Sequence, residues 1–415
     1  MTDEIATMVP VSRLAEYENG RAFKPEDFTD EGLPVIRIRE FLDSAVEPDR
    51  FNGEVRERNL VLDGDLLFAW SATLAVGFWR RGPAVLNQHL FRVTAHSGIE
   101  KSFLRWALDY AIVELAGHMH GSAMTHITRE MLKQVKVWLP GPSSQRGIAD
   151  FLDGHTAKID VLIEKQERLI ETLAERRQAV ISHAVTKGLD STAPMKDSGV
   201  EWLGTIPVTW SATKLKYMSA VQTGLTLGKT VPPDDAIELP YLRVANVQTN
   251  GVNLDEVKTV FVDRSEWTKY RLRDGDVLMT EGGDIDKLGR GCLWSNQIAP
   301  CVHQNHVFAV RCSAGLDSGM LVYLLAARVA RSYFQMTAKR ATNLASTNST
   351  TLGNLPIALP GIVDQIRIVE HLDQQTAQID ALSAKAREMI DVLKERRQAL
   401  ISAAVTGKID VRGLS

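Results

Sequence analysis

The stretch ERRQAVISHAVT (Glu175–Thr186) returns 220 residues later, almost unchanged, as ERRQALISAAVT (Glu395–Thr406). The match extends without a gap over Leu139–Asp190 and Leu359–Asp410, where 26 of 52 aligned residues are identical. An internal repeat of this strength decides how the chain is divided, because both copies are expected to fold alike. The chain is therefore a duplicated unit.

Both copies are predicted to be long helices. No proline lies between Ser143 and Ala193 or between Gly361 and the C-terminus, and the core positions are spaced alternately four and three residues apart, as in a coiled coil. The expected seam residues are Ile148, Leu152, His155, Ile159, Leu162, Gln166, Leu169, Leu173, Arg176 and Val180, then Ile368, Leu372, Gln375, Ile379, Leu382, Ala386, Met389, Leu393, Arg396 and Leu400. A lone helix would leave this stripe exposed. The simplest arrangement is an antiparallel pair about a pseudo-two-fold axis.

The segments before the two helices resemble one another more weakly. The matching stretches are Asn19-Gly20 and Thr223-Gly224, Leu33–Ile38 and Leu239–Val244, Leu62–Leu67 and Arg273–Leu278, and His89–Val93 and His306–Val310. Short β-rich runs alternate with Gly, Asp and Asn turns, and helical stretches follow at Ser102–Glu114 and Ser318–Tyr333. Each segment is thus expected to form a compact α+β domain.

The predicted fold class is α+β, with two globular domains separated by a long two-helix antiparallel coiled coil and a pseudo-two-fold internal repeat. We expect the first domain at 1–142, the first helix at 143–190, the second domain at 191–358 with a linker at 191–210, and the second helix with the C-terminal tail at 359–415. Two unlike domains and a stiff spacer suit a bipartite DNA target, whose half-sites recur every ~34–36 Å on one face.

Composition narrows the possible classes of protein. Lys and Arg number 48 against 51 Asp and Glu, which excludes a uniformly basic nucleic-acid coat but not a local basic face. Three cysteines indicate a reducing compartment. The N-terminus lacks a signal-peptide pattern, and no apolar run reaches the ~20 residues of a membrane span, so a cytoplasmic location is expected.

The layout, with its repeated ERRQA helix ends, resembles the specificity (S) subunit of type I restriction–modification enzymes. The stretch KDSGVEWLGTIP (Lys196–Pro207) is similar to that family's start of a target-recognition domain, and Ala404–Gly413 is similar to its usual C-terminus. The first domain lacks the EWLG–IP motif and begins near Val9.

This resemblance implies a non-catalytic subunit with two target-recognition domains, each reading half of a split double-stranded DNA sequence. It implies that the helices set the spacing and dock two methylation (M) subunits, that restriction (R) subunits join the full complex, and that the chain directs adenine methylation or ATP-dependent cleavage by these partners. No cofactor or metal is expected on this chain; S-adenosylmethionine, ATP and Mg are expected on the partners.

DNA-contacting residues are predicted from local charge and polarity. No acidic residue occurs between Ser318 and Val363, a stretch that carries four basic residues interleaved with Tyr333 and Phe334. Basic side chains anchor phosphates, whereas Asn, Gln and Arg read base edges. The candidates are Arg21, Lys24, Gln88, His89, Ser122, His126, Lys229, Lys287, Arg290, Gln304, Asn305, His306, Lys339, Arg340, Asn343, Thr347 and Asn348.

The repeated tetrads are assigned to partner docking or to closure of the helix ends, because they are identical while the domains have diverged. They comprise Glu175, Arg176, Arg177, Gln178, Glu395, Arg396, Arg397 and Gln398. A solvated charged face remains the alternative for these residues.

Other functions have weaker sequence support. Gly224–Thr230 is one residue short of a P-loop, and Cys292, Cys301, His303 and His306 lack the paired spacing of a zinc site. An enzyme on this scaffold, or a coiled-coil structural protein with no DNA role, are the competing classes. The two unlike domains favour a DNA adapter, since a plain scaffold gains nothing from two different heads.

Overall fold

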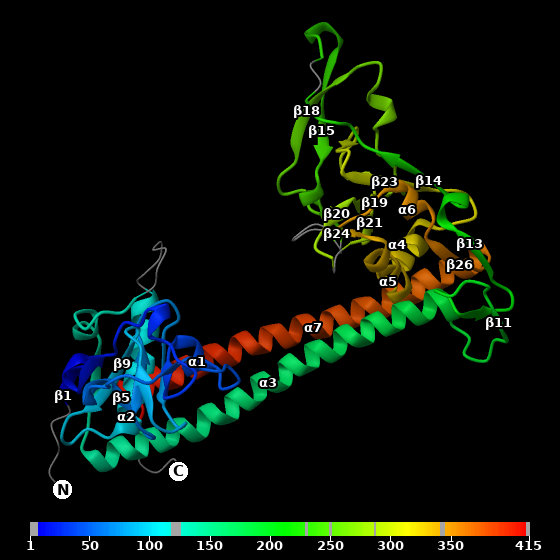
Figure 1. Cartoon of the computed structure of the whole chain (residues 1–415). Coiled ribbons are helices and arrows are strands. Elements are labelled where there is room, and N and C mark those ends of the chain that lie inside the picture. The colour runs from blue at the N-terminus through cyan, green and yellow to red at the C-terminus, as the bar shows by residue number, and fades with distance from the viewer. Residues whose placement is uncertain are drawn as a thin grey trace. The chain divides into compact units, whose positions relative to one another are not determined.

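The computed structural model describes residues 7–117, 126–228, 231–248, 251–285, 288–340 and 345–411 (Figure 1). The chain forms two compact units, the first made of residues 1–167 and 387–415 and the second of residues 168–386. Each unit contains a globular domain and a segment of each long helix, α3 (Pro142–Lys187) and α7 (Ile362–Val405). Pro142 occupies the first turn of α3, where its missing N–H costs no helical hydrogen bond.

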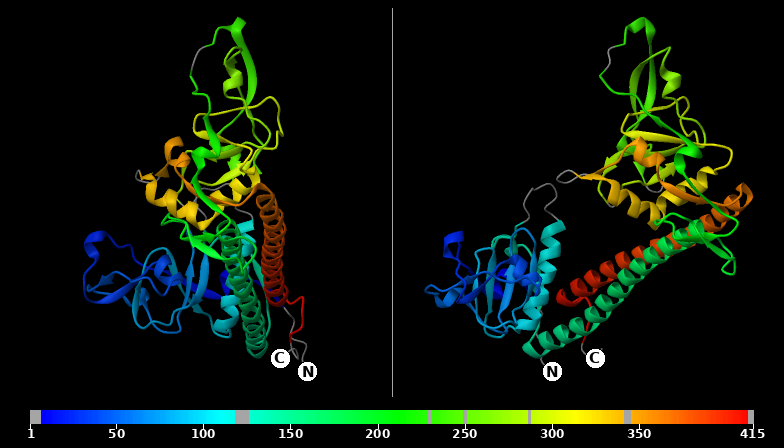
Figure 2. Two further views of the ribbon diagram at one scale, coloured as in Figure 1. Left: turned by 90° about the vertical axis from the view of Figure 1, so that its right-hand side faces the viewer. Right: turned by 45° about the vertical axis from the view of Figure 1, so that its right-hand side comes forward.

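In the first domain, a four-stranded antiparallel sheet has the order β2-β9-β6-β7 and packs against α2 (Figure 2). Phe103 and Trp106 of α2 are buried with Leu66 and Phe68 of the sheet. The elements are β1 (Thr7–Pro10), β2 (Ala15–Asn19), β3 (Leu33–Ile36), α1 (Ile38–Leu42), β4 (Arg50–Phe51), β5 (Leu60–Val61), β6 (Leu66–Ala69), β7 (Ala75–Phe78), β8 (Ala84–Leu86), β9 (Leu90–Ala95), α2 (Lys101–Gly117) and β10 (Lys136–Leu139). A second sheet has the order β4-β3-β8-β5, and β1 pairs with β10.

The second domain repeats this plan, with a main sheet of order β14-β23-β19-β21. Its strands are β11 (Met195–Asp197), β12 (Thr205–Pro207), β13 (Ser211–Lys214), β14 (Ser219–Thr223), β15 (Ala236–Leu242), β16 (Val247–Gln248), β17 (Gly251–Val252), β18 (Lys258–Asp263), β19 (Val277–Thr280), β20 (Gly282–Gly283), β21 (Gly291–Leu293), β22 (Val302–His303), β23 (Val307–Cys312), β24 (Lys339–Arg340), β25 (Ala345–Ser346) and β26 (Pro356–Leu359). Its helices are α4 (Ser318–Ala326), α5 (Arg328–Thr337) and α6 (Ser349–Gly353).

The two main sheets have the same strand register. Tyr17 faces Val93 across β2 and β9, and Val221 faces Val310 across β14 and β23. The predicted fold class is thereby confirmed as α+β, with two related domains and two long helices. None of the helices in the described residues is both long and apolar enough to cross a membrane.

Within each unit, segments of α3 and α7 pack side by side and antiparallel (Figures 1 and 2). Arg177 Nε lies 3.1 Å from Asp380 Oδ1 in the second unit, and Arg397 Nε lies 3.2 Å from Asp160 Oδ1 in the first. Asp160 and Asp380 are equivalent in the repeat, as are the two arginines. The two ion pairs therefore occupy equivalent positions in the repeat.

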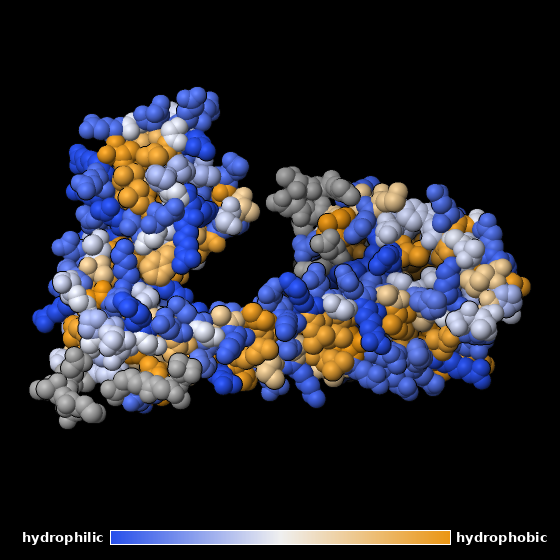
Figure 3. All heavy atoms as spheres, turned by 90° about the horizontal axis from the view of Figure 1, so that it is seen from below, coloured by the Kyte–Doolittle hydropathy of each residue, from blue (hydrophilic) through white to orange (hydrophobic). Residues whose placement is uncertain are grey.

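The predicted seam was wrong at alternate positions. Thr156 and Thr376 are buried where His155 and Gln375 were expected, and Arg176 and Arg396 are exposed. The exposed apolar residues include Leu162 (45%), Leu169 (42%), Leu382 (52%) and Met389 (49%). A four–three alternation fits the sequence in two phases one residue apart, and packing selects the phase that turns these four side chains outward. Figure 3 shows apolar side chains exposed along the helices.

A buried glutamine attaches the start of each long helix to its domain. Gln145 accepts a hydrogen bond from Glu100 N–H at 2.8 Å and donates to Gly98 O and Pro140 O. Gln365, its repeat mate, makes the same three bonds with Asp317 N–H, Gly315 O and Pro360 O. Both amides satisfy main-chain groups that would otherwise be buried without partners.

Candidate nucleic-acid interface

In each domain, four chain segments meet where the central strands of the main sheet begin and end. We call these residues the four-segment cluster. In the first domain it comprises Gly20–Arg21, Trp70–Ser71, Gln88–His89 and His126–Ile127, and in the second Gly224–Leu225, Glu281–Gly282, Asn305–His306 and Ser346–Thr347. Sheet register brings them together, although they span residues 20–127 in the first domain and 224–347 in the second.

Main-chain hydrogen bonds hold both clusters in the same way. Three amide-to-carbonyl bonds recur between equivalent residues. In the first domain they run from Trp70 N–H to His89 O (3.3 Å), from Ile127 N–H to Trp70 O (2.8 Å) and from Gln88 N–H to Arg21 O (3.0 Å). In the second domain the equivalent bonds run from Glu281 N–H to His306 O (2.9 Å), from Thr347 N–H to Glu281 O (2.8 Å) and from Asn305 N–H to Leu225 O (2.9 Å). The backbone frame is therefore common to the two domains.

A glycine permits the closest approach within each frame. A Cβ on Gly20 would lie 2.2 Å from Leu86 O, and a Cβ on Gly224 would lie 2.1 Å from His303 O. Because both obstacles are main-chain atoms of a sheet, they cannot move aside without breaking the sheet. This explains why the two domains share a glycine here while most neighbouring residues differ.

One histidine is common to both clusters, and a side chain from the neighbouring strand end holds each. Ser71 Oγ lies 2.9 Å from His89 Nδ1, and Glu281 Oε2 lies 2.6 Å from His306 Nδ1. An ionised carboxylate only accepts hydrogen bonds, so Nδ1 of His306 carries the proton. Among the described residues, Nε2 of this exposed ring has no hydrogen-bond partner.

The remaining side chains differ between the clusters. The pairs are Arg21 and Leu225, Trp70 and Glu281, Ser71 and Gly282, Gln88 and Asn305, and His126 and Ser346. One backbone frame therefore presents two different sets of hydrogen-bonding and apolar groups.

Comparisons with known proteins point to one family. Residues 7–172 match the family model described as the Type I restriction modification DNA specificity domain. The type I restriction enzyme EcoBI specificity subunit from Escherichia coli is 25% identical over 416 residues, covering 97% of this chain and 85% of the relative. The MjaVIII specificity subunit from Methanocaldococcus jannaschii is 22% identical over 421 residues, covering 98% and 94%.

The chain is thus similar along almost its whole length to type I restriction enzyme specificity subunits, and residues 7–172 match their DNA specificity domain. Solved structures share its fold. A chain from a study of complex assembly and conformational transition of the type I R-M system has a TM-score of 0.71 at 17% identity, covering 97% of this chain and 98% of that one. The HsdS subunit from Thermoanaerobacter tengcongensis has a TM-score of 0.54 at 17% identity, covering 98% of each chain.

Several of the residues that the sequence predicts to contact DNA lie in or beside the clusters. Those in the clusters are Arg21, Gln88, His89, His126, Asn305, His306 and Thr347, with Gln304 adjacent. Lys339 is exposed on β24, which joins the second cluster through β25. Ser122, Lys229, Lys287 and Asn343 lie outside the described residues, as does the side chain of Arg340.

Some of the predicted residues, including Arg21 of the first cluster, are held by neighbouring protein groups. The Arg21 guanidinium lies 4.4 Å from the centre of the Phe51 ring and 3.4 Å from Asp27 Oδ1. Asn348 accepts a hydrogen bond from Thr351 N–H and caps α6. Lys24 is exposed and lies 3.7 Å from Glu26. Arg290 lies outside the cluster and lines a pocket of about 200 Å³ together with Arg177.

The expectation that aromatic residues interleave with basic ones on a surface was wrong. Tyr333 and Phe334 of α5 are buried in the core of the second domain, because this helix packs its aromatic face inward. Arg331 of the same helix donates to Gln178 Oε1 at 2.7 Å. The stretch Ser318–Val363, which has no acidic residue, thus contributes core side chains and a contact with a long helix as well as basic charge.

The sequence did not single out the strand-end residues of the clusters, Trp70, Ser71, Glu281 and Gly282. A signal was present: the echo between Leu62–Leu67 and Arg273–Leu278, extended by three residues, aligns Trp70 with Glu281. Only the sheet register, however, brings them beside His89 and His306.

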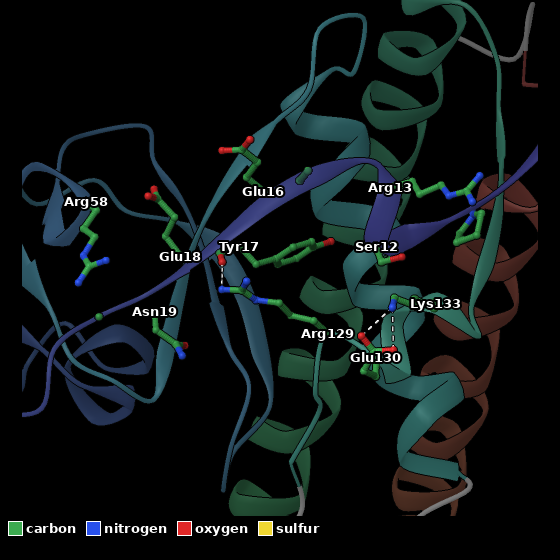
Figure 4. A pocket seen from close by; sticks show the side chains of 13 residues that line it. Ser12, Arg13, Glu16, Tyr17, Glu18, Asn19, Arg58, Arg129, Glu130 and Lys133 are labelled. Atoms are coloured by element: carbon green, nitrogen blue, oxygen red, sulfur yellow. Dashed lines mark hydrogen bonds and ion pairs between the residues drawn. The ribbon is translucent and has the colours of Figure 1, made fainter.

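A groove of about 930 Å³ runs along β2 next to the first cluster and reaches Gly20 (Figure 4). Its cationic lining residues are Arg13, Arg58, Arg129 and Lys133. Arg129 donates to Tyr17 O, and Lys133 Nζ lies 2.6 Å from Glu130 Oε1, so both are held (Figure 4). Among the described residues, Arg13 and Arg58 have no ion-pair or hydrogen-bond partner.

The repeated tetrads divide into paired and exposed residues. Arg177 and Arg397 form the inter-helix ion pairs, and Gln178 Nε2 donates to Ala326 O at 3.0 Å. Arg397 is also 3.5 Å from Asp109. The first two residues of each tetrad, Glu175, Arg176, Glu395 and Arg396, are exposed.

Three of the four residues in the cysteine and histidine pattern of the second domain, Cys292, Cys301 and His303, are buried in the core, whereas His306 is exposed. Burial raises the pKa of Cys292 to about 11 and that of Cys301 to about 12. Burial lowers the pKa of His303 to about 4, and its Nδ1 donates to Val307 O at 2.6 Å. Among the described residues, no group of three or more His, Cys, Asp or Glu is arranged to hold a metal ion.

Proposed function

We propose that this chain is the DNA-sequence-specificity subunit of a type I restriction–modification complex. Each target-recognition domain reads one half of a bipartite double-stranded target through its four-segment cluster. The observation that carries this proposal is the shared backbone frame with different side chains, because such a frame presents a different base-reading surface at an equivalent site. Lys339, and Arg13 and Arg58 along the groove, are suited to phosphate contacts, which position without reading sequence.

The helix pair sets the spacing of the half-sites and docks two methylation subunits. Support comes from the exposed apolar residues Leu162 and Leu169 and their repeat mates Leu382 and Met389. Matched apolar positions on the two helices suit two copies of one partner. The exposed residues of the tetrads, Glu175, Arg176, Glu395 and Arg396, would form the polar rim of that contact.

The chain itself carries no catalytic centre in this proposal and acts in the cytoplasm. S-adenosylmethionine serves the methylation subunits, and ATP and Mg serve the restriction subunits where these join. The chain contributes affinity and register, directing adenine methylation or ATP-dependent cleavage by its partners.

Mapping of methylated adenines in cells that carry this chain with its methylation subunits tests the proposal. The parent is expected to give one bipartite motif. Gln88→Ala is expected to relax only one half of that motif, and its matched variant Asn305→Ala only the other half. The proposal fails if the parent gives no bipartite motif, or if each variant alters both halves or neither.

A further inference from the structure

Glu281 is an unexpected residue for a surface that faces DNA. It occupies the centre of the second four-segment cluster, where the first domain has Trp70. Phosphates repel a carboxylate, so an acidic side chain on such a surface weakens binding unless it faces a group that donates hydrogen bonds.

The structure fixes Glu281 firmly. Its N–H donates to His306 O at 2.9 Å, and its carbonyl accepts from Thr347 N–H at 2.8 Å. Its side chain is 33% exposed, and Oε2 accepts from His306 Nδ1 at 2.6 Å. Among the described residues, Oε1 has no hydrogen-bond partner. One carboxylate oxygen is thus held while the other is left for an outside donor.

Basic residues lie in the three-stranded sheet β20-β25-β24, which begins directly after this carboxylate. Gly282, the next residue, pairs with Ser346 of β25, and β25 pairs in turn with Lys339 and Arg340 of β24. A basic strand in the sheet that follows a carboxylate with one unpaired oxygen suits a site in which phosphates lie over the strand and base edges lie over the carboxylate.

We propose that Glu281 reads an exocyclic amino group in the major groove of the second half-site, either N4 of cytosine or N6 of adenine, and that His306 positions it. The inference rests on the function proposed above. A carboxylate only accepts hydrogen bonds, and the other polar major-groove groups, guanine O6 and N7, adenine N7 and thymine O4, are acceptors as well. Amino groups are therefore the donors that fit.

The test uses the chain assembled with its methylation subunits. Methylated adenines are mapped for the parent, Glu281→Gln, Glu281→Ala and the control Glu238→Gln. Glu238 is a carboxylate of the same domain that accepts one hydrogen bond, from Thr259 Oγ1 at 2.6 Å, but lies on β15 outside the cluster. Both Glu281 variants are expected to relax one C or A position of the second half-site, with discrimination falling roughly tenfold. The first half-site and the control stay unchanged.

His306 is tested as a positioning residue. His306→Ala is expected to relax the same position as the Glu281 variants. His306→Gln, whose amide can still donate to the carboxylate, is expected to retain the parental preference. Relaxation of a different position by His306→Ala would contradict the positioning role.

An unchanged motif with both Glu281 variants, at parental extents of methylation, overturns the inference. Where methylation is too low to map, binding of the complex is compared on four duplexes that differ only at the assigned base pair, and equal loss on all four also overturns it. The proposed function fails separately, since that requires the parent to lack a bipartite motif.

Discussion

The long helices and the four-segment clusters are both duplicated, but their copies retain different features. The two helices share side-chain contacts. Gln145 and Gln365 make the same three hydrogen bonds, and the two inter-helix ion pairs occupy equivalent positions in the repeat. The clusters retain main-chain bonds, and His89 and His306 are their only shared non-glycine side chain. Side chains persist at these contacts within the protein and differ where DNA is proposed to bind.

The shared frame is most severely tested at its glycine. In Gly224→Ala, the new Cβ would lie 2.1 Å from His303 O, so we expect a loss of more than about 3 kcal/mol of folding free energy. Denaturant unfolding measures the loss, and amide hydrogen exchange assigns it to the second domain. Gly154→Ala, in an open position on α3, is the control and is expected to be neutral or stabilising by about 1 kcal/mol. Equal stability of the two variants would contradict the close approach.

The stability of the two domains should depend differently on pH, because His303 of the second domain occupies the position in the sheet that Leu86 occupies in the first. Burial lowers the pKa of folded His303 to about 4, below its ordinary value of 6.5, so its unfolded state takes up the proton first. The stability present above pH 6.5 is therefore lost as pH falls toward 4, by about 3 kcal/mol in total.

Thermal unfolding between pH 7 and pH 4 measures this loss. His303→Leu places the residue of the first domain at this position. We expect it to remove this loss of about 3 kcal/mol from the pH dependence of the unfolding free energy. The variant also leaves the Val307 carbonyl without its hydrogen bond, which lowers its stability at neutral pH. An identical pH slope in parent and variant would show that His303 is not responsible.

Replacement of either of the two equivalent glutamines, Gln145 or Gln365, should lower the folding free energy by the same amount. Gln145→Leu leaves one buried N–H and two carbonyls without partners, and Gln365→Leu does the same in the other unit. We expect each variant to lose about 2–3 kcal/mol of folding free energy. The control Gln374→Leu, on an exposed face of α7, should change it by less than about 0.5 kcal/mol. Unequal losses at the two glutamines would weaken the claim of matched roles.

The smallest expected effect is at the ion pairs. Double-mutant cycles between Arg177 and Asp380 and between Arg397 and Asp160 should give about 0.5–1 kcal/mol each, because these pairs are partly exposed. Arg397→Ala should cost more than Arg177→Ala, since Arg397 also lies near Asp109. A coupling energy of zero in both cycles would mean that apolar packing alone sets the helix register.

The sequence predicted the repeat, the two domains and the paired helices, because a gap-free match and a long heptad pattern reflect backbone geometry directly. It misplaced the seam, since Leu162 and Leu169 fit one phase of the heptad as well as Ile163 and Ile170 fit the other. It indicated His89 and His306 through an echo in the chain. It could not pair them with Ser71 and Glu281, because that contact depends on sheet register.

The main-chain construction of the clusters has a consequence for how such proteins diversify. The bonds that close each cluster run between amides and carbonyls, so a change at position 88, 281 or 305 alters what the surface offers without removing what holds it together. New target preferences can thus arise by single substitutions in one domain, with little loss of folding free energy and no change in the other.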